Sequence, residues 1–189
     1  MQTLEKKVWT YDDYLKLPDD KRYEIIKGEI HMSPAPTTLH QLVLMTLYKT
    51  IDSKLNDEGI IFIAPTDLVL SEKDIVQPDL MIISKSRKEM IKERGIFGSP
   101  DLVVEIISKG SLSRDLEIKR KLYAEYEIKE YWIVFPKEEF IEIFSLEGTE
   151  YVLYKSSDDS KMLCSKVFKN LCVDVEKLFK SVKKIMKEW

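Results

Sequence analysis

The segment from Asp101 to Ser108 constrains the fold of this chain more than any other part of the sequence. It reads Asp-Leu-Val-Val-Glu-Ile-Ile-Ser and is nearly all apolar between its two ends. Side chains alternate between the faces of a strand, so this strand would present apolar side chains on both faces. Strands of this kind lie near the centre of a sheet whose two faces are both covered.

Helical and strand-like segments follow one another along the rest of the chain. Helices are predicted over Trp9–Leu17, Thr38–Leu55, Lys85–Arg94 and Leu112–Tyr126, and from Asp174 to the C-terminus. A hairpin is predicted over Arg22–Ser33. Strands are predicted over Ile60–Leu70 (interrupted at Pro65), Ile75–Ser84, Glu130–Phe135, Glu139–Phe144 and Glu150–Tyr154. This order predicts an α/β (α+β) fold, a central mixed β-sheet flanked by helices.

The length and composition fit one domain. The chain has 189 residues, of which 44% are hydrophobic and 33% charged, as in ordinary globular proteins. No Gly- or Ser-rich linker divides it, so we predict a single domain over residues 1–189, with residues 145–189 as a C-terminal β and helical extension. The net charge of −3 is not the basic footprint of a general nucleic-acid binder. A metal ion held by acidic residues would, however, reverse the local charge at an active site.

The sequence carries no membrane or targeting signal. No stretch approaches the roughly 20 apolar residues of a membrane span, and the N-terminus lacks the apolar core of a signal peptide. We therefore expect a cytoplasmic protein with no membrane partner. Cys164 and Cys172 lack Cys-x-x-Cys spacing, and in a reducing cytosol they are predicted to be buried free thiols.

Two carboxylates, those of Asp79 and Glu105, stand in strand-like apolar surroundings. A buried carboxylate is costly unless a cation or a set of hydrogen bonds compensates it. Two such groups on two strands can converge on one Mg²⁺, which is often held by one or two carboxylates with water and phosphate. For Glu105 taken alone, a salt bridge to a lysine or arginine is an equally good explanation. For Asp79, which follows Pro78, the alternative is a turn-forming aspartate.

Two further charged residues are candidates for the same site. Lys119 falls in the middle of an apolar stripe on the helix predicted over Leu112–Tyr126. It either extends its amine to solvent, the usual outcome for a lysine, or reaches a buried anion. In a nuclease such a lysine can orient the attacking water or stabilise charge on the phosphate. Glu24 could supply another metal oxygen, and its alternative is a solvated glutamate at a strand edge.

The two histidines and the remaining motifs give little sign of other chemistry. His31 and His40 do not have zinc-ligand spacing. His40 lies at the start of a predicted helix, beside Leu39, and we interpret it as a core or capping histidine rather than a catalytic one. The sequence contains no Gly-x-Ser-x-Gly elbow, Walker loop, His-Glu-x-x-His or Gly-x-Gly-x-x-Gly motif.

A set of short motifs occurs in a specific order along the chain. They are Tyr23–Glu29, Ser33–Pro36 with His40, Gln77–Leu80, Ser99–Ser108, Asp115 with Lys119 and Tyr123, and Glu130–Val134. Each motif alone is weak, but the ordered set, from about Trp9 to about Phe144, resembles the Uma-two family of restriction endonucleases. That family belongs to the PD-(D/E)XK nuclease superfamily.

The resemblance implies a restriction-endonuclease-like fold and a Mg²⁺-dependent hydrolase site, with Mn²⁺ as the alternative metal and DNA as the substrate. By its place in the motifs, Asp79 is the aspartate of the PD pair and Glu105 is the second acid. The metal ligands would be these two carboxylates and the carbonyl of Ile106. Glu24 matches the early acidic position of the family.

The chain departs from the superfamily pattern at a few positions. Ile107 stands where the superfamily has a lysine, and the resemblance implies that Lys119 takes over that place in space. Phe135 stands where the family usually has an aspartate, and Ser108–Ser111 replaces the usual Ser-Pro-Ser-Thr. Neither of the last two changes touches the expected metal ligands.

The leading hypothesis is therefore a metal-dependent endonuclease that hydrolyses DNA phosphodiester bonds. The alternative is a catalytically inactive module with a nuclease fold that binds nucleic acid or protein. A homodimer or higher homo-oligomer is expected, because cutting both strands of DNA needs two sites. A third possibility is a purely structural or assembly role, in which exposed aromatic side chains near Tyr131 and Trp132 form a homodimer interface.

Overall fold

The computed structural model describes residues 7–18, 21–33, 35–108 and 114–188. Its helices are α1 (Tyr11–Tyr14), α2 (Thr38–Leu55), α3 (Arg120–Glu125) and α4 (Val175–Lys187), with a 3₁₀ segment η1 (Lys85–Met90) and a π-helical segment η2 (Arg114–Lys119). Its first eight strands are β1 (Arg22–Ile26), β2 (Glu29–Ser33), β3 (Gly59–Ile63), β4 (Leu68–Ser71), β5 (Asp74–Val76), β6 (Leu80–Ser84), β7 (Ile91–Lys92) and β8 (Gly95–Phe97). The others are β9 (Leu102–Ile106), β10 (Glu130–Phe135), β11 (Phe140–Glu147), β12 (Glu150–Ser156), β13 (Met162–Cys164) and β14 (Cys172–Asp174).

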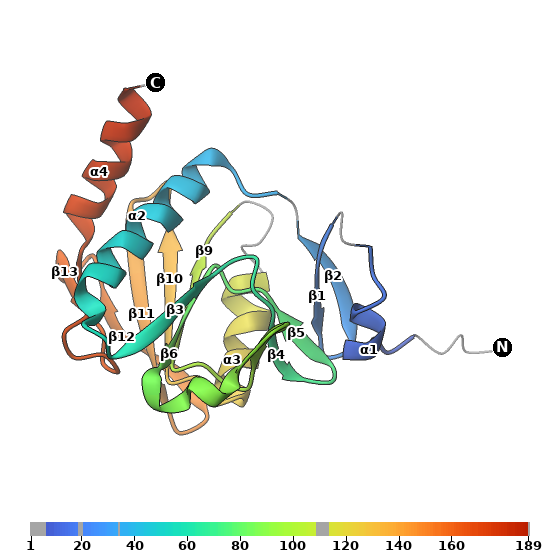
Figure 1. Ribbon diagram of the computed structural model, residues 1–189. Coiled ribbons are helices and arrows are strands. Elements are labelled where there is room, and N and C mark those ends of the chain that lie inside the picture. The colour runs from blue at the N-terminus through green and yellow to red at the C-terminus, as the bar shows by residue number, and fades with distance from the viewer. Residues whose placement is uncertain (1–6, 19–20, 34, 109–113, 189) are drawn as a thin grey trace.

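A six-stranded mixed sheet forms the centre of the molecule, in the order β12-β11-β10-β9-β6-β3 (Figure 1). β9 lies inside this sheet, parallel to β10 on one side and antiparallel to β6 on the other. All five residues of β9 are buried. The prediction of a central strand at this position is confirmed, and so is the mixed sheet with flanking helices.

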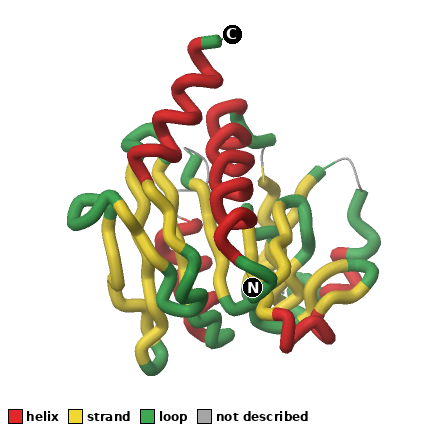
Figure 2. The backbone as a smooth tube through the Cα atoms, turned by 60° about the vertical axis from the view of Figure 1, so that its left-hand side comes forward, coloured by secondary structure: helices red, strands yellow, loops and turns green. Residues whose placement is uncertain are grey.

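Two apolar cores lie on the two faces of this sheet. Leu102, Val104 and Ile106 of β9 share one core with the buried residues of α2 and α4. Val103, on the opposite face, packs in a second core with Leu122 of α3. In Figure 2 the two long helices, α2 and α4, run side by side over the strands. Because β9 carries apolar side chains on both of its faces, helices cover both faces of the central sheet.

A second six-stranded sheet, in the order β2-β1-β5-β4-β8-β7, lies beside the first and carries the predicted hairpin. β1 and β2 pair antiparallel, with Ile26 opposite Glu29. Lys27 and Gly28 form the turn, both with positive φ angles of 53° and 74°. Two residues with positive φ are what a two-residue hairpin turn requires, so the prediction at Lys27-Gly28 is confirmed.

The prediction of a helix over Lys85–Arg94 is wrong for the second half of this segment. The segment forms η1 and then the short strand β7, which pairs antiparallel with β8. Gly95 has a φ of +150°, and a Cβ there would lie 2.6 Å from the carbonyl oxygen of Asp67. The segment is rich in charged helix formers but lacks an apolar stripe, so strand pairing and the close approach at Gly95 outweigh helix propensity.

Two predicted strands are each divided between the two sheets. Ile60–Leu70 becomes β3 and β4, separated around Pro65, and Ile75–Ser84 becomes β5 and β6, separated around Gln77-Pro78. Proline removes a donor from the ladder, which favours a change of sheet at these points. The helix predicted from Leu112 starts outside the described residues, and from Arg114 the chain is π-helical and then α-helical.

Cys164 and Cys172 form a disulfide, so the prediction of free thiols is wrong. β13 and β14 pair antiparallel, and their register sets these two residues directly opposite each other. The eight-residue separation gave no sign of this, because the pairing depends on how the intervening loop folds back.

The segment that carries β13, β14 and α4 packs on the central sheet and is anchored by a buried acid. Glu130 of β10 is fully buried and accepts hydrogen bonds from the Trp132 indole, the Ser165 hydroxyl and the backbone N–H groups of Lys166 and Val167. These donors compensate the charge that β10 would otherwise bury. The loop between β13 and β14 is thereby tied to the first core.

Replacing Glu130 with glutamine is expected to change how stability depends on pH. Burial raises the pKa of the Glu130 carboxyl above its ordinary 4.5, outweighing the donors that lower it. Between the two pKa values the folded protein binds more protons than the unfolded chain, so this group lowers the free energy of unfolding as pH rises through that window. Denaturant titrations from below pH 4.5 to neutral pH should show a smaller fall for Glu130→Gln than for wild type. An equal fall in both proteins would contradict the assignment.

Candidate functional site

Asp79 and Glu105 lie at the same end of the central sheet. β6 and β9 pair antiparallel with Leu80 opposite Val104. Asp79 immediately precedes Leu80 on one strand, and Glu105 immediately follows Val104 on the other. The Asp79 Oδ2 atom accepts a hydrogen bond of 2.7 Å from the backbone N–H of Ile106. Both carboxylates are buried, with 7% and 3% of their residues exposed. The two acids predicted as metal ligands are thus brought together by the pairing of two strands.

Lys119 joins this pair from η2. Its Nζ atom lies 3.0 Å from Glu105 Oε1 and 2.8 Å from Glu24 Oε1, and its side chain is almost completely buried. The amine therefore turns inward to a buried anion and does not extend to solvent. Glu24 comes from β1 in the second sheet, so the ammonium group links the two sheets. Glu24 is buried rather than solvated.

His40 and Tyr123 complete the surroundings of the two acids. The His40 Nε2 atom lies 3.1 Å from Asp79 Oδ2, and the Tyr123 hydroxyl donates a 2.6 Å hydrogen bond to Glu105 Oε1. Burial, followed by the charge of Glu105, raises the pKa of Tyr123 well above its ordinary value, so this hydroxyl keeps its proton. α2 presents His40 on one face of the sheet, and α3 presents Tyr123 on the other.

The interpretation of His40 as a core or capping residue missed this contact. The backbone N–H of His40 does donate to the Thr37 hydroxyl that caps α2, at 3.2 Å, but the ring is directed at Asp79. A signal was present in the sequence. His40 precedes Leu44 and Leu47 by four and seven residues, which places it on the buried face of the helix.

The charges of the site favour a cation. The site holds three buried carboxylates, on Asp79, Glu105 and Glu24, and one ammonium group, on Lys119, which contacts Glu24 and Glu105, so carboxylates outnumber cations among these four residues. Among the residues that the structure describes, no three His, Cys, Asp or Glu side chains converge into a complete metal cage. Mg²⁺ does not require one, because it keeps several waters and often takes only one or two carboxylates. The donor set therefore fits a hard divalent cation.

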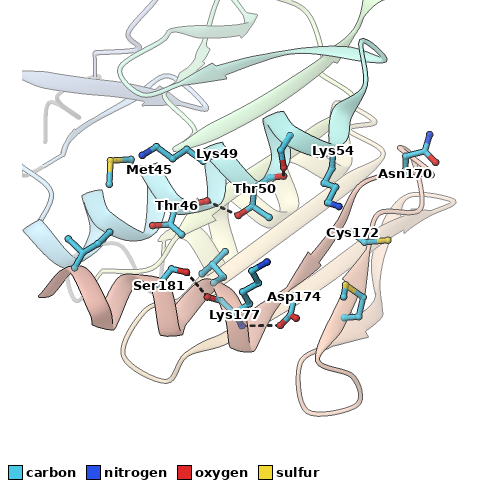
Figure 3. Close-up of a pocket in the computed structure, with 14 residues that line it drawn as sticks. Met45, Thr46, Lys49, Thr50, Lys54, Asn170, Cys172, Asp174, Lys177 and Ser181 are labelled. Atoms are coloured by element: carbon cyan, nitrogen blue, oxygen red, sulfur yellow. Dashed lines mark hydrogen bonds between the residues drawn. The ribbon is translucent and has the colours of Figure 1, made fainter. Parts of the chain in front are cut away.

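A groove separate from the candidate site lies between α2 and α4. It has a volume of about 840 Å³, with Lys49, Lys54 and Lys177 among its lining residues (Figure 3). None of the candidate site residues lines this groove. The chemistry at the end of the sheet and this groove are therefore distinct features of the molecule.

Two sequence expectations about partners can be compared with the structure. Tyr131 and Trp132 have 0% of their surface exposed, so the prediction that they form a subunit interface is wrong. They face opposite sides of β10 and pack in the two cores. Within the described ranges, no helix has the length and apolar character needed to cross a membrane.

Comparison with known proteins agrees with this architecture. The structure is similar to the crystal structure of a protein from Anabaena variabilis ATCC 29413 described as "a putative nuclease belonging to DUF820", with a TM-score of 0.75 over 92% of this chain and 98% of that chain. Sequence identity is 19%, so this likeness shows the fold alone. No curated protein matches the chain. The family described as "Putative restriction endonuclease" matches residues 11–176, and this chain therefore belongs to the Uma2 family.

Proposed function

We propose that this protein is a Mg²⁺-dependent endonuclease of the PD-(D/E)XK type that hydrolyses DNA phosphodiester bonds. The observation that carries the proposal is that Asp79 and Glu105 lie at the same end of the central sheet. Asp79 accepts a hydrogen bond from the N–H of Ile106, the residue after Glu105, and Lys119 is held 3.0 Å from Glu105. Family membership and the similar fold of a protein described as a nuclease support the same assignment. Mn²⁺ is the natural substitute for Mg²⁺ at oxygen ligands.

In this proposal Asp79, Glu105 and the carbonyl of Ile106 would hold the metal ion. When bound, the ion lowers the pKa of a coordinated water and offsets the charge of the phosphate. Lys119 orients the attacking water and stabilises the negative charge that develops on the phosphate oxygens. Glu24 holds the Lys119 amine in place from the second sheet, at 2.8 Å.

His40 and Tyr123 act as positioning residues. Each contacts one oxygen of a proposed ligand, His40 on Asp79 and Tyr123 on Glu105. Such partners orient carboxylates for metal binding, and their loss commonly costs about 10–100-fold in affinity or activity. The backbone N–H of Ile106 restrains Asp79 in the same way.

The experiment that tests the proposal is nicking of supercoiled plasmid DNA with Mg²⁺, with Mn²⁺ and with EDTA. Cleavage is expected with either metal and none with EDTA, because the proposed site supplies no other activated water. Calorimetric titration of each metal into the protein measures binding independently of cleavage. Equal cleavage with and without EDTA would refute the metal-dependent mechanism.

A non-catalytic binding module is the second candidate. It is favoured by the direct contacts of Lys119 with both Glu24 and Glu105, which compensate these carboxylates without a metal ion. This version predicts DNA binding that weakens with salt but does not depend on metal. Metal binding without nicking would leave the site standing and point to another substrate. No metal binding at all would favour this second candidate.

Cutting both strands of a duplex needs two such sites, so we propose that the protein works as a homodimer or higher homo-oligomer, in the cytoplasm. Light scattering at working concentration tests the assembly. A strictly monomeric protein would overturn this part of the proposal.

A further inference from the structure

A polar pocket of about 580 Å³ lies directly beside the candidate site. Its walls come from five separate parts of the chain: the end of α1, the start of β1, the segment from β3 to β4, Gln77 between β5 and β6, and the turn between β7 and β8. The pocket is therefore built by the tertiary structure, and no single motif contains it.

Positive charge predominates in this pocket. Four cationic residues line it, Lys21, Arg22, Lys92 and Arg94, against two acids, Asp67 and Glu93. Among the described residues none of the four cations forms a salt bridge, whereas Asp67 accepts hydrogen bonds from Tyr14 and Gln77. In a chain of net charge −3, four cations that have no carboxylate partner among the described residues, gathered at one place, indicate a site for an anion.

The uncharged walls suit a nucleobase. Three aromatic residues, Tyr14, Tyr23 and Phe62, are among those that line the pocket, and aromatic rings stack on every type of base. Two of its residues have buried polar atoms without a hydrogen-bond partner in the described part of the chain, the Arg22 Nε donor and the Gln77 Oε1 acceptor. Buried polar groups are normally paired, so these atoms indicate that a further partner belongs here.

Backbone contacts connect the pocket to the proposed catalytic residues. The N–H of Gln77 donates to Glu24 Oε1 at 2.9 Å, and Glu24 in turn contacts Lys119. On the other side, the carbonyl of Asp79 accepts from the N–H of Ala64, which precedes Pro65 of the pocket wall. A strand of DNA whose phosphate lies at Asp79 and Glu105 can therefore place an adjacent nucleotide in the pocket.

We propose that this pocket binds one nucleotide of the substrate strand next to the bond that is cut. The cations hold its phosphate, the aromatic rings stack on its base, and Arg22 and Gln77 contact the polar edge of that base. This inference rests on the proposed nuclease function and adds the place where the chain recognises a nucleotide. Such a pocket explains how an acidic protein can bind DNA without a broad basic surface.

The test compares two double variants that remove the same charge. Lys92→Gln with Arg94→Gln changes the pocket, at the turn between β7 and β8, and leaves the proposed metal ligands and Lys119 untouched. Lys49→Gln with Lys54→Gln is the matched control, because it removes two cations from the groove between α2 and α4. Binding of a short fluorescein-labelled DNA strand is measured by anisotropy in EDTA, over a range of salt concentrations, so that no cleavage occurs.

The pocket variant is expected to bind DNA about 10–100-fold more weakly than wild type, and its slope of log affinity against log salt should be less steep by about 1.4, for two lost phosphate contacts on a single strand. The control should bind as wild type does. Unchanged binding in the pocket variant, or an equal loss in the control, would overturn the proposal.

Competition separates a nucleotide site from a simple phosphate site. A deoxynucleoside 5′-monophosphate is expected to displace the labelled strand at lower concentration than inorganic phosphate, because only the nucleotide can stack on the rings. Equal competition by both would refute the role of the base.

If wild type cuts DNA but the pocket variant binds normally, the pocket assignment fails and the nuclease assignment stands. If the pocket variant loses binding in a protein that never cuts DNA, the nucleotide pocket stands and the catalytic assignment fails.

Discussion

Replacing Asp79 with asparagine, or Glu105 with glutamine, is expected to reduce metal-dependent DNA cleavage by at least about a hundredfold while the fold is retained. Loss of a partner in the outer shell of a metal ligand already costs about 10–100-fold, so loss of a ligand should cost no less. The amide side chains are nearly the same size as the acids, and each keeps an oxygen that can accept a hydrogen bond, such as that from the Ile106 N–H to Asp79. Rates of plasmid nicking at saturating Mg²⁺ measure the effect, and calorimetry measures the loss of metal affinity.

A buried acid at the far end of the same strand is the matched control. Asp101 is 1% exposed and precedes β9, at the opposite end from Glu105, and it pairs with Arg87 and Lys129. Asp101→Asn should lower stability without lowering cleavage per folded molecule. If Asp79→Asn and Glu105→Gln both cut DNA at the wild-type rate, the proposed metal site is wrong.

Replacing Lys119 with methionine is expected to lower the free energy of unfolding by about 3–5 kcal/mol, because it leaves buried carboxylates without their cation. Lys119 contacts both Glu24 and Glu105, and all three residues are at most 3% exposed. Denaturant unfolding at neutral pH measures the loss. Cleavage should also fall, because the proposed positioning of the water depends on the same amine.

Two further variants test whether the loss of charge compensation causes the expected loss of stability in Lys119→Met. Lys180→Met removes an exposed lysine that pairs with Glu176 on the surface of α4, and it should change stability little, because solvent screens such pairs. Adding Glu24→Gln to Lys119→Met should recover part of the lost stability, since one uncompensated charge is removed. A Lys119→Met protein as stable as Lys180→Met would show that the buried ion pair is not important to the fold.

Elements with a strong local pattern could be predicted from the sequence. β9 was recognisable because it is apolar on both faces, and α2 because its apolar residues recur at helical spacing. The hairpin at Lys27-Gly28 has turn residues that tolerate positive φ. Each of these signals depends on neighbours within a few residues, so the sequence alone predicts the element.

The candidate site was predicted only in part. Asp79, Glu105 and Lys119 were recognisable as charges in apolar surroundings, but their partners were not. His40 reaches Asp79 across 39 residues, and Glu24 meets Lys119 across 95 residues and from another sheet. Nothing in the local sequence states which of two distant charges will meet.

The sequence by itself determined where the central strand lies, where the apolar faces of the helices lie, and which acids would be costly to bury. The tertiary structure alone decided that Lys85–Arg94 leaves the helix for a strand, that Cys164 meets Cys172, and that five separate segments enclose a basic pocket beside Glu24. The physical reason is how far apart along the chain the interacting residues lie. Propensity and periodicity act over a few residues, whereas strand register, ion pairs and pockets arise from contacts between segments that only the folded chain brings together.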